Sequence, residues 1–244
     1  MIQNISSEEY DLKFPKNSHL RIMGDSLLNI KNPIVLEFGV ERGTSTKSFI
    51  WLMEKLDGKI YSVDINDCSN ISNSKNWFFL KSNDLKINYV LDEFKEIKNI
   101  GVDLIYIDSY HENFHVNKLL NLYFKYLKKN RSIFIDDIDN KEYRDHYSRK
   151  KRFGIFDPSY WRISFQCIVY DLIDEATKEF YYNNFDKTYY IKYFGENGLG
   201  RLDKISEFLD EPNAPKKLWN YNLILRLIYP YLKKLRNLLK FIKN

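Results

Sequence analysis

The sequence predicts an α/β fold organised around a doubly wound, mostly parallel sheet with helices on both faces. Two observations predict it. Short apolar runs recur along the chain, as buried parallel strands do, and segments with helical periodicity lie between them. The connections are short, so each helix is expected to pack on the strands beside it. We expect a seven-stranded sheet whose last two strands form a C-terminal antiparallel hairpin, followed by an appended basic helical tail.

Five parallel strands are expected in chain order. Each is a short apolar run, and the fourth, VDLIYID, has a strong pattern. They lie at residues 34–38, 59–65, 77–82, 102–108 and 132–137. The aromatic segment EFYYNNFDKTYYIKYF, residues 179–194, predicts two further strands joined by an Asn-Asn-Phe-Asp turn. This segment is the expected antiparallel hairpin.

Helix-spaced apolar residues fill the intervals between the strands. In the segment 46–56 they share one face, and Asp57-Gly58 ends the helix. A short helix is expected within residues 18–30, capped by Asn17 or Ser18. The other helices are expected at residues 85–97, 113–127 and 155–174.

Charge and proline positions divide the chain. It has 38 basic and 33 acidic residues, a net charge of +5. Eight basic residues and no acidic one lie from Lys216 to Asn244, which leaves residues 1–215 with a net charge of −3. An acidic body argues against a nucleic-acid partner. We expect an N-terminal helical lid or substrate segment at 1–32, the main domain at 33–211, and the tail at 212–244.

The tail has the pattern of a basic amphipathic helix. Its leucines share one arc, and most of its basic residues lie on the other side. Such a helix can lie on an anionic membrane surface, or pack on the domain or on a second subunit. Neither a signal peptide nor a run of about 18 apolar residues is apparent, and Cys68 and Cys167 are expected to be reduced thiols. We therefore expect a cytoplasmic protein and leave peripheral membrane contact and a homodimer open.

The turn after the first strand combines two glycines with two acidic residues. Gly39 and Gly43 allow the backbone to approach a ligand, and the following helix offers free N–H groups at its start. Glu37 and Glu41 would repel a pyrophosphate but suit a ligand that carries an ammonium and a sulfonium group. An ordinary strand-to-helix turn is the alternative interpretation.

Acidic residues also follow three later strands. Asp64 ends the second strand, where a carboxylate can accept hydrogen bonds from both hydroxyls of a ribose. Asp108, Asp136 and Asp137 end the fourth and fifth strands, and such a cluster is unfavourable unless a cation or protons neutralise it. Mg²⁺ prefers oxygen ligands, and His111 could act as a base beside it. Alternatively, Asp137 and Asp139 cap the next helix and His111 is a surface histidine.

Together, these segments resemble the class I S-adenosylmethionine (SAM)-dependent methyltransferases. VLEFGVERGTSTKSFIWL resembles their first motif and KIYSVDI their second. The segment from VDLIYIDSYH to SIFIDD is similar to metal-dependent sugar O-methyltransferases of the macrocin O-methyltransferase type, from bacterial glycan clusters. The resemblance covers about residues 33–200 and implies a Rossmann-like sheet with SAM as cofactor.

The resemblance also implies a role for each matching residue. His111 would be the general base, acting with Asp108, and Asp64 would hold the ribose. The implied metal ligands, for a divalent cation such as Mg²⁺, are Asp108, Asp136 and Asp137. The implied cofactor-binding residues are Glu37, Gly39, Glu41, Gly43, Ser45, Asp64, Asp84 and Asp108. This chain departs from the family at Ser109, where the family has glycine, and at residues 129–131, which replace a Pro-Gly or Gly-Gly turn.

We therefore predict an O-methyltransferase that acts on a hydroxyl of a sugar or surface-glycan precursor. The basic run at residues 141–152 would recognise a phosphate or acidic sugar, or form a solvated helix face. Two alternatives remain open. One is a metal-independent small-molecule methyltransferase, and the other is a noncatalytic Rossmann-like module tethered by its basic tail.

Overall fold

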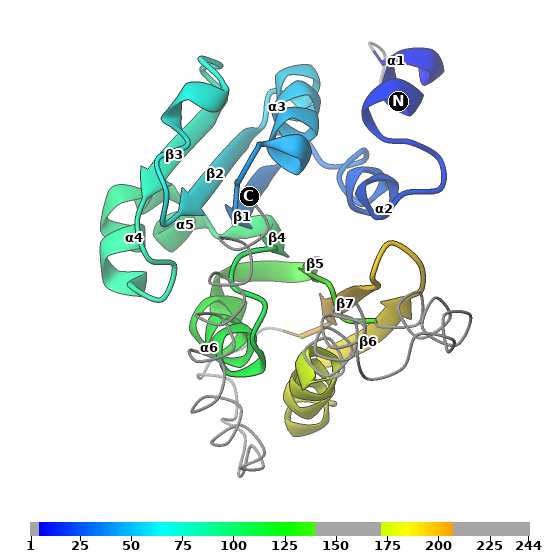
Figure 1. The fold of residues 1–244 in the computed structure, drawn as a ribbon, viewed down its shortest axis with the longest axis vertical. Coiled ribbons are helices and arrows are strands. Elements are labelled where there is room, and N and C mark those ends of the chain that lie inside the picture. The colour runs from blue at the N-terminus through cyan, green and yellow to red at the C-terminus, as the bar shows by residue number, and fades with distance from the viewer. Residues whose placement is uncertain (1–4, 140–171, 207–244) are drawn as a thin grey trace, which may run out of the picture. The chain divides into compact units, whose positions relative to one another are not determined.

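The structure, a computed structural model, describes residues 5–139 and 172–206 and contains the expected seven-stranded sheet (Figure 1). The strand order is β3-β2-β1-β4-β5-β7-β6. The first five strands are parallel, and β7 lies antiparallel between β5 and β6. The predicted fold class is confirmed. The strands are β1 (Ile34–Phe38), β2 (Lys59–Asp64), β3 (Trp77–Lys81), β4 (Val102–Ile107), β5 (Leu127–Asp136), β6 (Thr188–Tyr193) and β7 (Leu199–Lys204).

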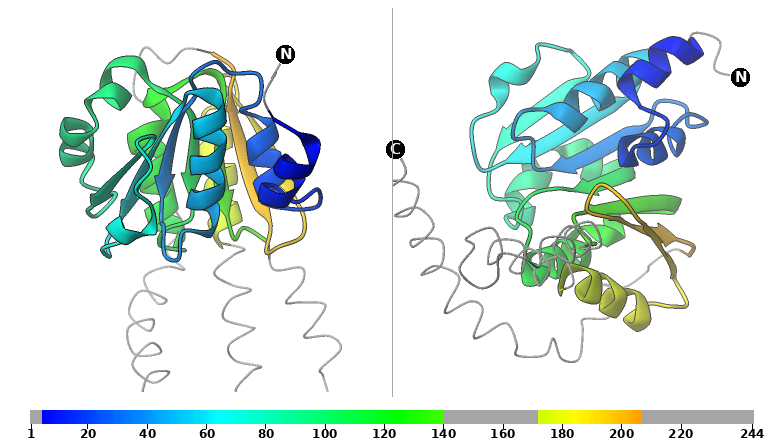
Figure 2. Two further views of the ribbon diagram at one scale, coloured as in Figure 1. Left: turned by 90° about the horizontal axis from the view of Figure 1, so that it is seen from above. Right: turned by 45° about the vertical axis from the view of Figure 1, so that its right-hand side comes forward.

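Helices cover both faces of this sheet, as Figures 1 and 2 show. One buried core joins α1, α2 and α3 to one face, and a second joins α4, α5 and α6 to the other. The two cores arise because successive strand residues point to opposite faces. The helices are α1 (Ser7–Lys13), α2 (His19–Asp25), α3 (Thr44–Leu56), α4 (Ile87–Glu93), α5 (Lys95–Ile100) and α6 (Asn113–Tyr123), with short 3₁₀ turns η1 (Ser69–Ile71) and η2 (Phe124–Tyr126).

The predicted hairpin at residues 179–194 is wrong in its first half. Residues 172–183 are helical, and β6 pairs with β7 instead of with that segment. Ile173, Ala176 and Phe180 are buried at helical spacing, and the Phe180 ring packs 5.1 Å from that of Phe124. Burial of this helical stripe outweighs the strand preference of the aromatic residues that follow it.

One helix and one strand also differ from the predicted boundaries. The helix expected at 85–97 is divided at Phe94 into α4 and α5. The fifth strand begins at Leu127, earlier than expected, and the register between β4 and β5 shifts within it. Asn130 takes a positive φ of 58° in this stretch, a conformation that glycine adopts more readily than other residues.

The N-terminal segment folds onto the same body as the sheet. Phe14, Met23 and Leu27 are buried in the core that includes Phe49 of α3. The chain divides into compact units of residues 1–214 and 215–244. Most of the helix expected at 155–174, the basic run at 141–152, Cys167 and the tail at 212–244 lie outside the described residues. In the part that is described, no helix has the length and apolar character needed to cross a membrane.

Candidate functional site

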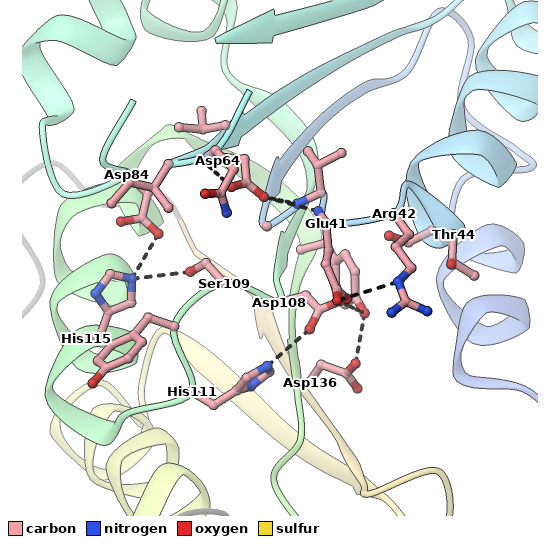
Figure 3. Close-up of a pocket in the computed structure, with 18 of the residues that line it drawn as sticks. Glu41, Arg42, Thr44, Asp64, Asp84, Asp108, Ser109, His111, His115 and Asp136 are labelled. Carbon is pink, nitrogen blue, oxygen red and sulfur yellow. Dashed lines mark hydrogen bonds and ion pairs between the residues drawn. The ribbon is translucent and has the colours of Figure 1, made fainter. Parts of the chain in front are cut away.

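A pocket of about 800 Å³ opens along the carboxyl ends of the parallel strands (Figure 3). Its walls come from α2, the β1–α3 turn, the ends of β2 to β5 and the turn between β6 and β7. Open parallel sheets bind ligands at this edge. Predicted site residues that line it are Gly39, Glu41, Ser45, Asp64, Asp84, Asp108, His111 and Asp136. Glu37, Gly43 and Asp137 are not among the described residues that do so.

Glu37, which we expected to line the cofactor site, lies beneath it and is fully buried. Its carboxylate accepts hydrogen bonds from the hydroxyls of Ser45, Thr46 and Ser62, each at 2.8 Å. Burial raises the pKa of Glu37 to about 7, although the three hydroxyls oppose this rise. Because two of the donors belong to the first turn of α3, Glu37 fixes the start of that helix under the pocket. Direct contact between Glu37 and a cofactor stays a prediction.

The β1–α3 turn is shaped by its glycines. A Cβ atom on Gly39, at φ 92°, would lie 2.1 Å from the backbone oxygen of Asp108. Gly43, at φ 72°, is the N-cap of α3 and packs against Ile71. Position 39 therefore admits only glycine at this spacing, because the ends of β1 and β4 approach each other there.

Asp64 connects the end of β2 to the same turn. Its Oδ2 accepts hydrogen bonds from the backbone N–H groups of Val40 (2.8 Å) and Glu41 (3.1 Å), and its Oδ1 accepts one from Asn66 (2.8 Å). The carboxylate thus holds the turn in place while it lines the pocket. The Glu41 side chain is itself largely exposed and lies 3.9 Å from Arg42.

Asp84, after β3, is paired with a histidine that the sequence did not indicate. The Nε2 atom of His115 lies 2.9 Å from Asp84 Oδ2 and 3.2 Å from the Ser109 hydroxyl. All three residues line the pocket (Figure 3). This end of the pocket therefore has a hydrogen-bonded wall built from β3, the β4–α6 loop and α6.

The predicted metal ligands meet around His111 and Tyr106. His111 Nε2 lies 3.5 Å from Asp108, and His111 Nδ1 lies 3.5 Å from Asp137. The buried Tyr106 hydroxyl lies 3.0 Å from Asp136 and 3.3 Å from Asp108, and it can donate its proton to only one of them. The structure thus brings the catalytic and metal residues of the prediction to one edge of the sheet.

Asp108 is destabilised as an anion in this cluster. Burial, followed by the negative charges of Asp136 and Asp137, raises the pKa of Asp108 to about 9. Carboxylate oxygens are the ligands that a hard divalent cation prefers, so the donor set has suitable chemistry for Mg²⁺. Among the described residues, however, no three His, Cys, Asp or Glu side chains are arranged to hold a metal ion. A metal here stays a prediction.

The N-terminal segment and the β6–β7 turn also contribute to the pocket. Glu196 takes a positive φ of 46° and accepts a hydrogen bond from the backbone N–H of His19 at 2.8 Å. The Nδ1 atom of His19 lies 3.8 Å from both Asp136 and Glu196. Sequence reasoning missed this contact, because nothing local to His19 indicates residues so far along the chain.

Two other missed residues carried a local signal. Tyr106 precedes Asp108 by two positions in a strand, so alternation places their side chains on the same face. His115 follows His111 by four positions at the start of a predicted helix, which brings it near the same edge.

Comparison with known proteins agrees with the fold. Residues 36–138 match a family model described as a methyltransferase domain. The MycE methyltransferase of the mycinamycin biosynthetic pathway, solved with Mg and S-adenosylhomocysteine (SAH), is 18% identical, with a TM-score of 0.53 over 86% of this chain. The chain spans 56% of the length of MycE.

The SAH-bound methyltransferase PaMTH1 of Podospora anserina is 14% identical, with a TM-score of 0.54 over 82% of this chain and 86% of its own. At these identities the structures share a fold. No curated protein matches the sequence.

Proposed function

We propose that the chain is a SAM-dependent methyltransferase with a class I fold, and that it transfers the methyl group to a hydroxyl oxygen of a sugar or glycan precursor. The observation that carries this proposal is the position of His111 between Asp108 and Asp137 at the pocket edge. Methyl transfer to a hydroxyl oxygen needs a group that takes the hydroxyl proton, and imidazole is the side chain that most often does so in proteins.

The cofactor half of the pocket supports SAM as the methyl donor. Asp64 has the position that holds a ribose in folds of this type, and the glycine turn lets the backbone approach the ligand. Six acidic side chains line the pocket: Glu41, Asp64, Asp84, Asp108, Asp136 and Glu196. Their charge favours a sulfonium and an ammonium group over a pyrophosphate.

We propose that Asp108, Asp136 and Asp137 hold a divalent cation on the acceptor side. When bound, the cation would lower the pKa of the acceptor hydroxyl, and SAM would supply the methyl group. His111 accepts the hydroxyl proton as the new oxygen–carbon bond forms and the sulfur–carbon bond breaks, which leaves SAH. The rest of the site contributes alignment, because displacement at carbon requires the reacting atoms to be in line.

A polyhydroxylated acceptor fits the remaining wall. Leu20 and Met23 of α2 offer apolar contacts, whereas Asp136 and Glu196 offer hydrogen-bond acceptors for hydroxyl groups. In this proposal α2 acts as part of a lid over the acceptor. The basic tail, proposed for peripheral membrane contact, and the basic run at 141–152, proposed to recognise a phosphate or acidic sugar, lie outside the described part of the chain.

A metal-independent methyltransferase is the second candidate. It is favoured by the absence, in residues 5–139 and 172–206, of a three-residue arrangement suited to a metal. Tyr106 and His111 would then hold the carboxylates of Asp108 and Asp136 through hydrogen bonds alone. Proton removal by His111 is common to both candidates.

Calorimetric titration with SAH, with and without Mg²⁺, tests the proposal on the wild type and on Asp64→Ala. We expect micromolar binding to the wild type and weak binding to the variant. An absence of binding under both conditions would refute the methyltransferase assignment. SAH binding without any measurable Mg²⁺ binding would favour the metal-independent candidate, and turnover with sugar acceptors would then identify the substrate.

A further inference from the structure

His19, the first residue of α2, lines the pocket beside Asp136 and Glu196, and the mechanism above does not use it. Its side chain is only 9% exposed. Its Nε2 atom is buried and has no hydrogen-bond partner among the described residues. An unsatisfied polar atom in a buried side chain costs free energy, so its presence at a pocket wall needs an explanation.

The other ring nitrogen of His19 also falls short of a direct hydrogen bond. Nδ1 lies 3.8 Å from Asp136 Oδ1 and 3.8 Å from Glu196 Oε2. Both distances exceed the range of about 2.7–3.2 Å in which an N–H group bonds to oxygen. Carboxylates accept hydrogen bonds, so the two neighbours favour the tautomer with hydrogen on Nδ1. His19 therefore has a donor near two acceptors that it does not reach.

The position of the His19 ring is determined by its backbone and its helix. The His19 backbone N–H donates a hydrogen bond to Glu196 Oε2 at 2.8 Å. Ser18 caps α2 by accepting the backbone N–H of Arg21 at 3.2 Å, and Met23 buries the helix in the core. The imidazole is thus held at this distance from the carboxylates without any hydrogen bond of its own ring to the described residues.

Glu196 is held on the other side of this separation by an unusual turn. All four residues at 195–198 take a positive φ, and Glu196 does so at 46° although it is not glycine. The backbone N–H of Asp139 donates to the backbone oxygen of Asn197 at 2.6 Å, which fastens the turn to the end of β5. Non-glycine residues keep this conformation where the surrounding structure imposes it, often at ligand sites.

One oxygen atom of a hydroxyl group can bridge the His19 ring to these carboxylates. Two hydrogen bonds of about 2.8 Å that meet at one atom span a separation of 3.8 Å. A hydroxyl accepts the hydrogen of Nδ1 and donates its own proton to a carboxylate. An ether oxygen has no proton to donate, an ammonium group cannot accept, and a phosphate would be repelled by the two carboxylates.

Resting on the proposed function, we infer that His19 is a specificity-determining residue that binds a second hydroxyl group of the acceptor, together with Asp136 or Glu196. This hydroxyl is not the one that is methylated, because the methylated hydroxyl gives its proton to His111 in the mechanism above. An acceptor that uses both contacts has at least two hydroxyl groups on one small framework. Pyranose rings meet this requirement, whereas simple alcohols do not.

The test measures the binding of methyl glycosides to the SAH-saturated chain with Mg²⁺, by calorimetry. The probes are the methyl pyranosides of glucose, mannose, galactose and rhamnose, each with its monodeoxy analogues. We expect the wild type to bind one glycoside roughly 10-fold more tightly than the analogue that lacks the second hydroxyl. His19→Phe, which keeps a ring but no nitrogen, should reduce this ratio toward one by weakening the intact glycoside.

A conservative variant and a matched control make the comparison decisive. His19→Asn can place its side-chain amide where Nδ1 lies and should restore much of the ratio. Asn17→Ala changes an exposed residue two positions earlier and should leave the ratio at its wild-type value. His19→Leu replaces the phenylalanine variant if that variant does not fold, and the SAH affinity of each variant shows that its cofactor site is intact.

The outcomes separate this inference from the proposed function. An unchanged ratio in His19→Phe, or an equal loss for a glycoside and all of its analogues, would overturn the role, because a merely structural residue weakens all of them alike. Equal binding of all probes by the wild type would mean that only water bridges His19 to the carboxylates. If SAH binds but no glycoside does, this inference fails while the SAM assignment stands, and if SAH does not bind, the proposed function itself fails.

Discussion

The two halves of the pocket satisfy their carboxylates in different ways. On the proposed cofactor side, Asp64 accepts hydrogen bonds from three backbone N–H groups and Asp84 is paired with His115. On the proposed acceptor side, Asp108 lies among other carboxylates, and its pKa is raised to about 9. In the first half, Asp64 and Asp84 each have a hydrogen-bond donor. In the second half, several carboxyl groups lie around one histidine and one tyrosine.

The hydrogen-bonded carboxylates of the first half have a fixed geometry before a ligand binds. The carboxylate cluster of the second half is stabilised only by what binds to it. Donors supplied by the backbone fix geometry before any ligand arrives, which reduces the entropy that binding must overcome. A carboxylate cluster is stabilised only when a cation or a proton enters it. Substitutions on the proposed cofactor side should therefore change the affinity for SAH, whereas substitutions on the proposed acceptor side should change turnover.

The largest expected effect is on turnover, from His111→Ala. Loss of the proton acceptor should lower kcat by roughly 10²–10⁴-fold and leave the SAH dissociation constant near the wild-type value. Initial rates with an identified acceptor and calorimetry with SAH measure the two quantities. Unchanged turnover would remove His111 from the mechanism, and a parallel loss of SAH affinity would show that the two halves are not separable.

Asp64→Ala should have the next largest effect, on cofactor binding. The substitution removes the ribose acceptor and also releases the N–H groups of Val40 and Glu41, so the SAH dissociation constant should rise roughly 100-fold. Asp67→Ala is the matched control, because within the described residues the Asp67 carboxylate accepts hydrogen bonds only from Ser69. Equal effects of the two substitutions would contradict the role given to Asp64.

Glu37→Gln should change how stability depends on pH. Because the folded-state pKa of Glu37 is raised to about 7, its protonation contributes stability that is full below about 4.5 and is lost as pH rises through 7. This contribution is on the order of a few kcal/mol. Urea denaturation across this window should show a shallower decline in the free energy of unfolding for the variant. Parallel declines would indicate that Glu37 titrates normally.

The smallest expected effect concerns the contact between α2 and the β6–β7 turn. Glu196→Gln weakens the acceptor for the His19 N–H, and because the Glu196 side chain is about half exposed the cost should be about 1 kcal/mol or less. Hydrogen exchange at the start of α2 should become faster, while exchange in β1 stays the same. Glu175→Gln, an exposed change on the helix of residues 172–183, serves as the control. Identical exchange in the two variants would mean that Glu196 does not restrain α2.

The sequence allowed one half of the site to be predicted better than the other. Asp64, Asp108 and Asp136 could be placed because strands ending in acidic residues must bring them to one sheet edge. His19 and Glu196 could not be placed, since their contact depends on how α2 docks and on a turn of residues with positive φ. The hairpin was misplaced for a related reason: the aromatic residues at 180–182 favour strands, whereas the burial of Ile173, Ala176 and Phe180 at helical spacing selects the helix.

The close approach of Gly39 to the backbone oxygen of Asp108 has a consequence for how the enzyme can change over time. That close approach joins the loop of the proposed cofactor site to the loop of the proposed acceptor site through main-chain atoms alone. The separation between the two reactants is therefore a property of the scaffold, and side chains around the acceptor can be exchanged without altering it. In such a domain, substitutions of the side chains around the acceptor can change which acceptor binds, while the backbone geometry needed for methyl transfer stays the same.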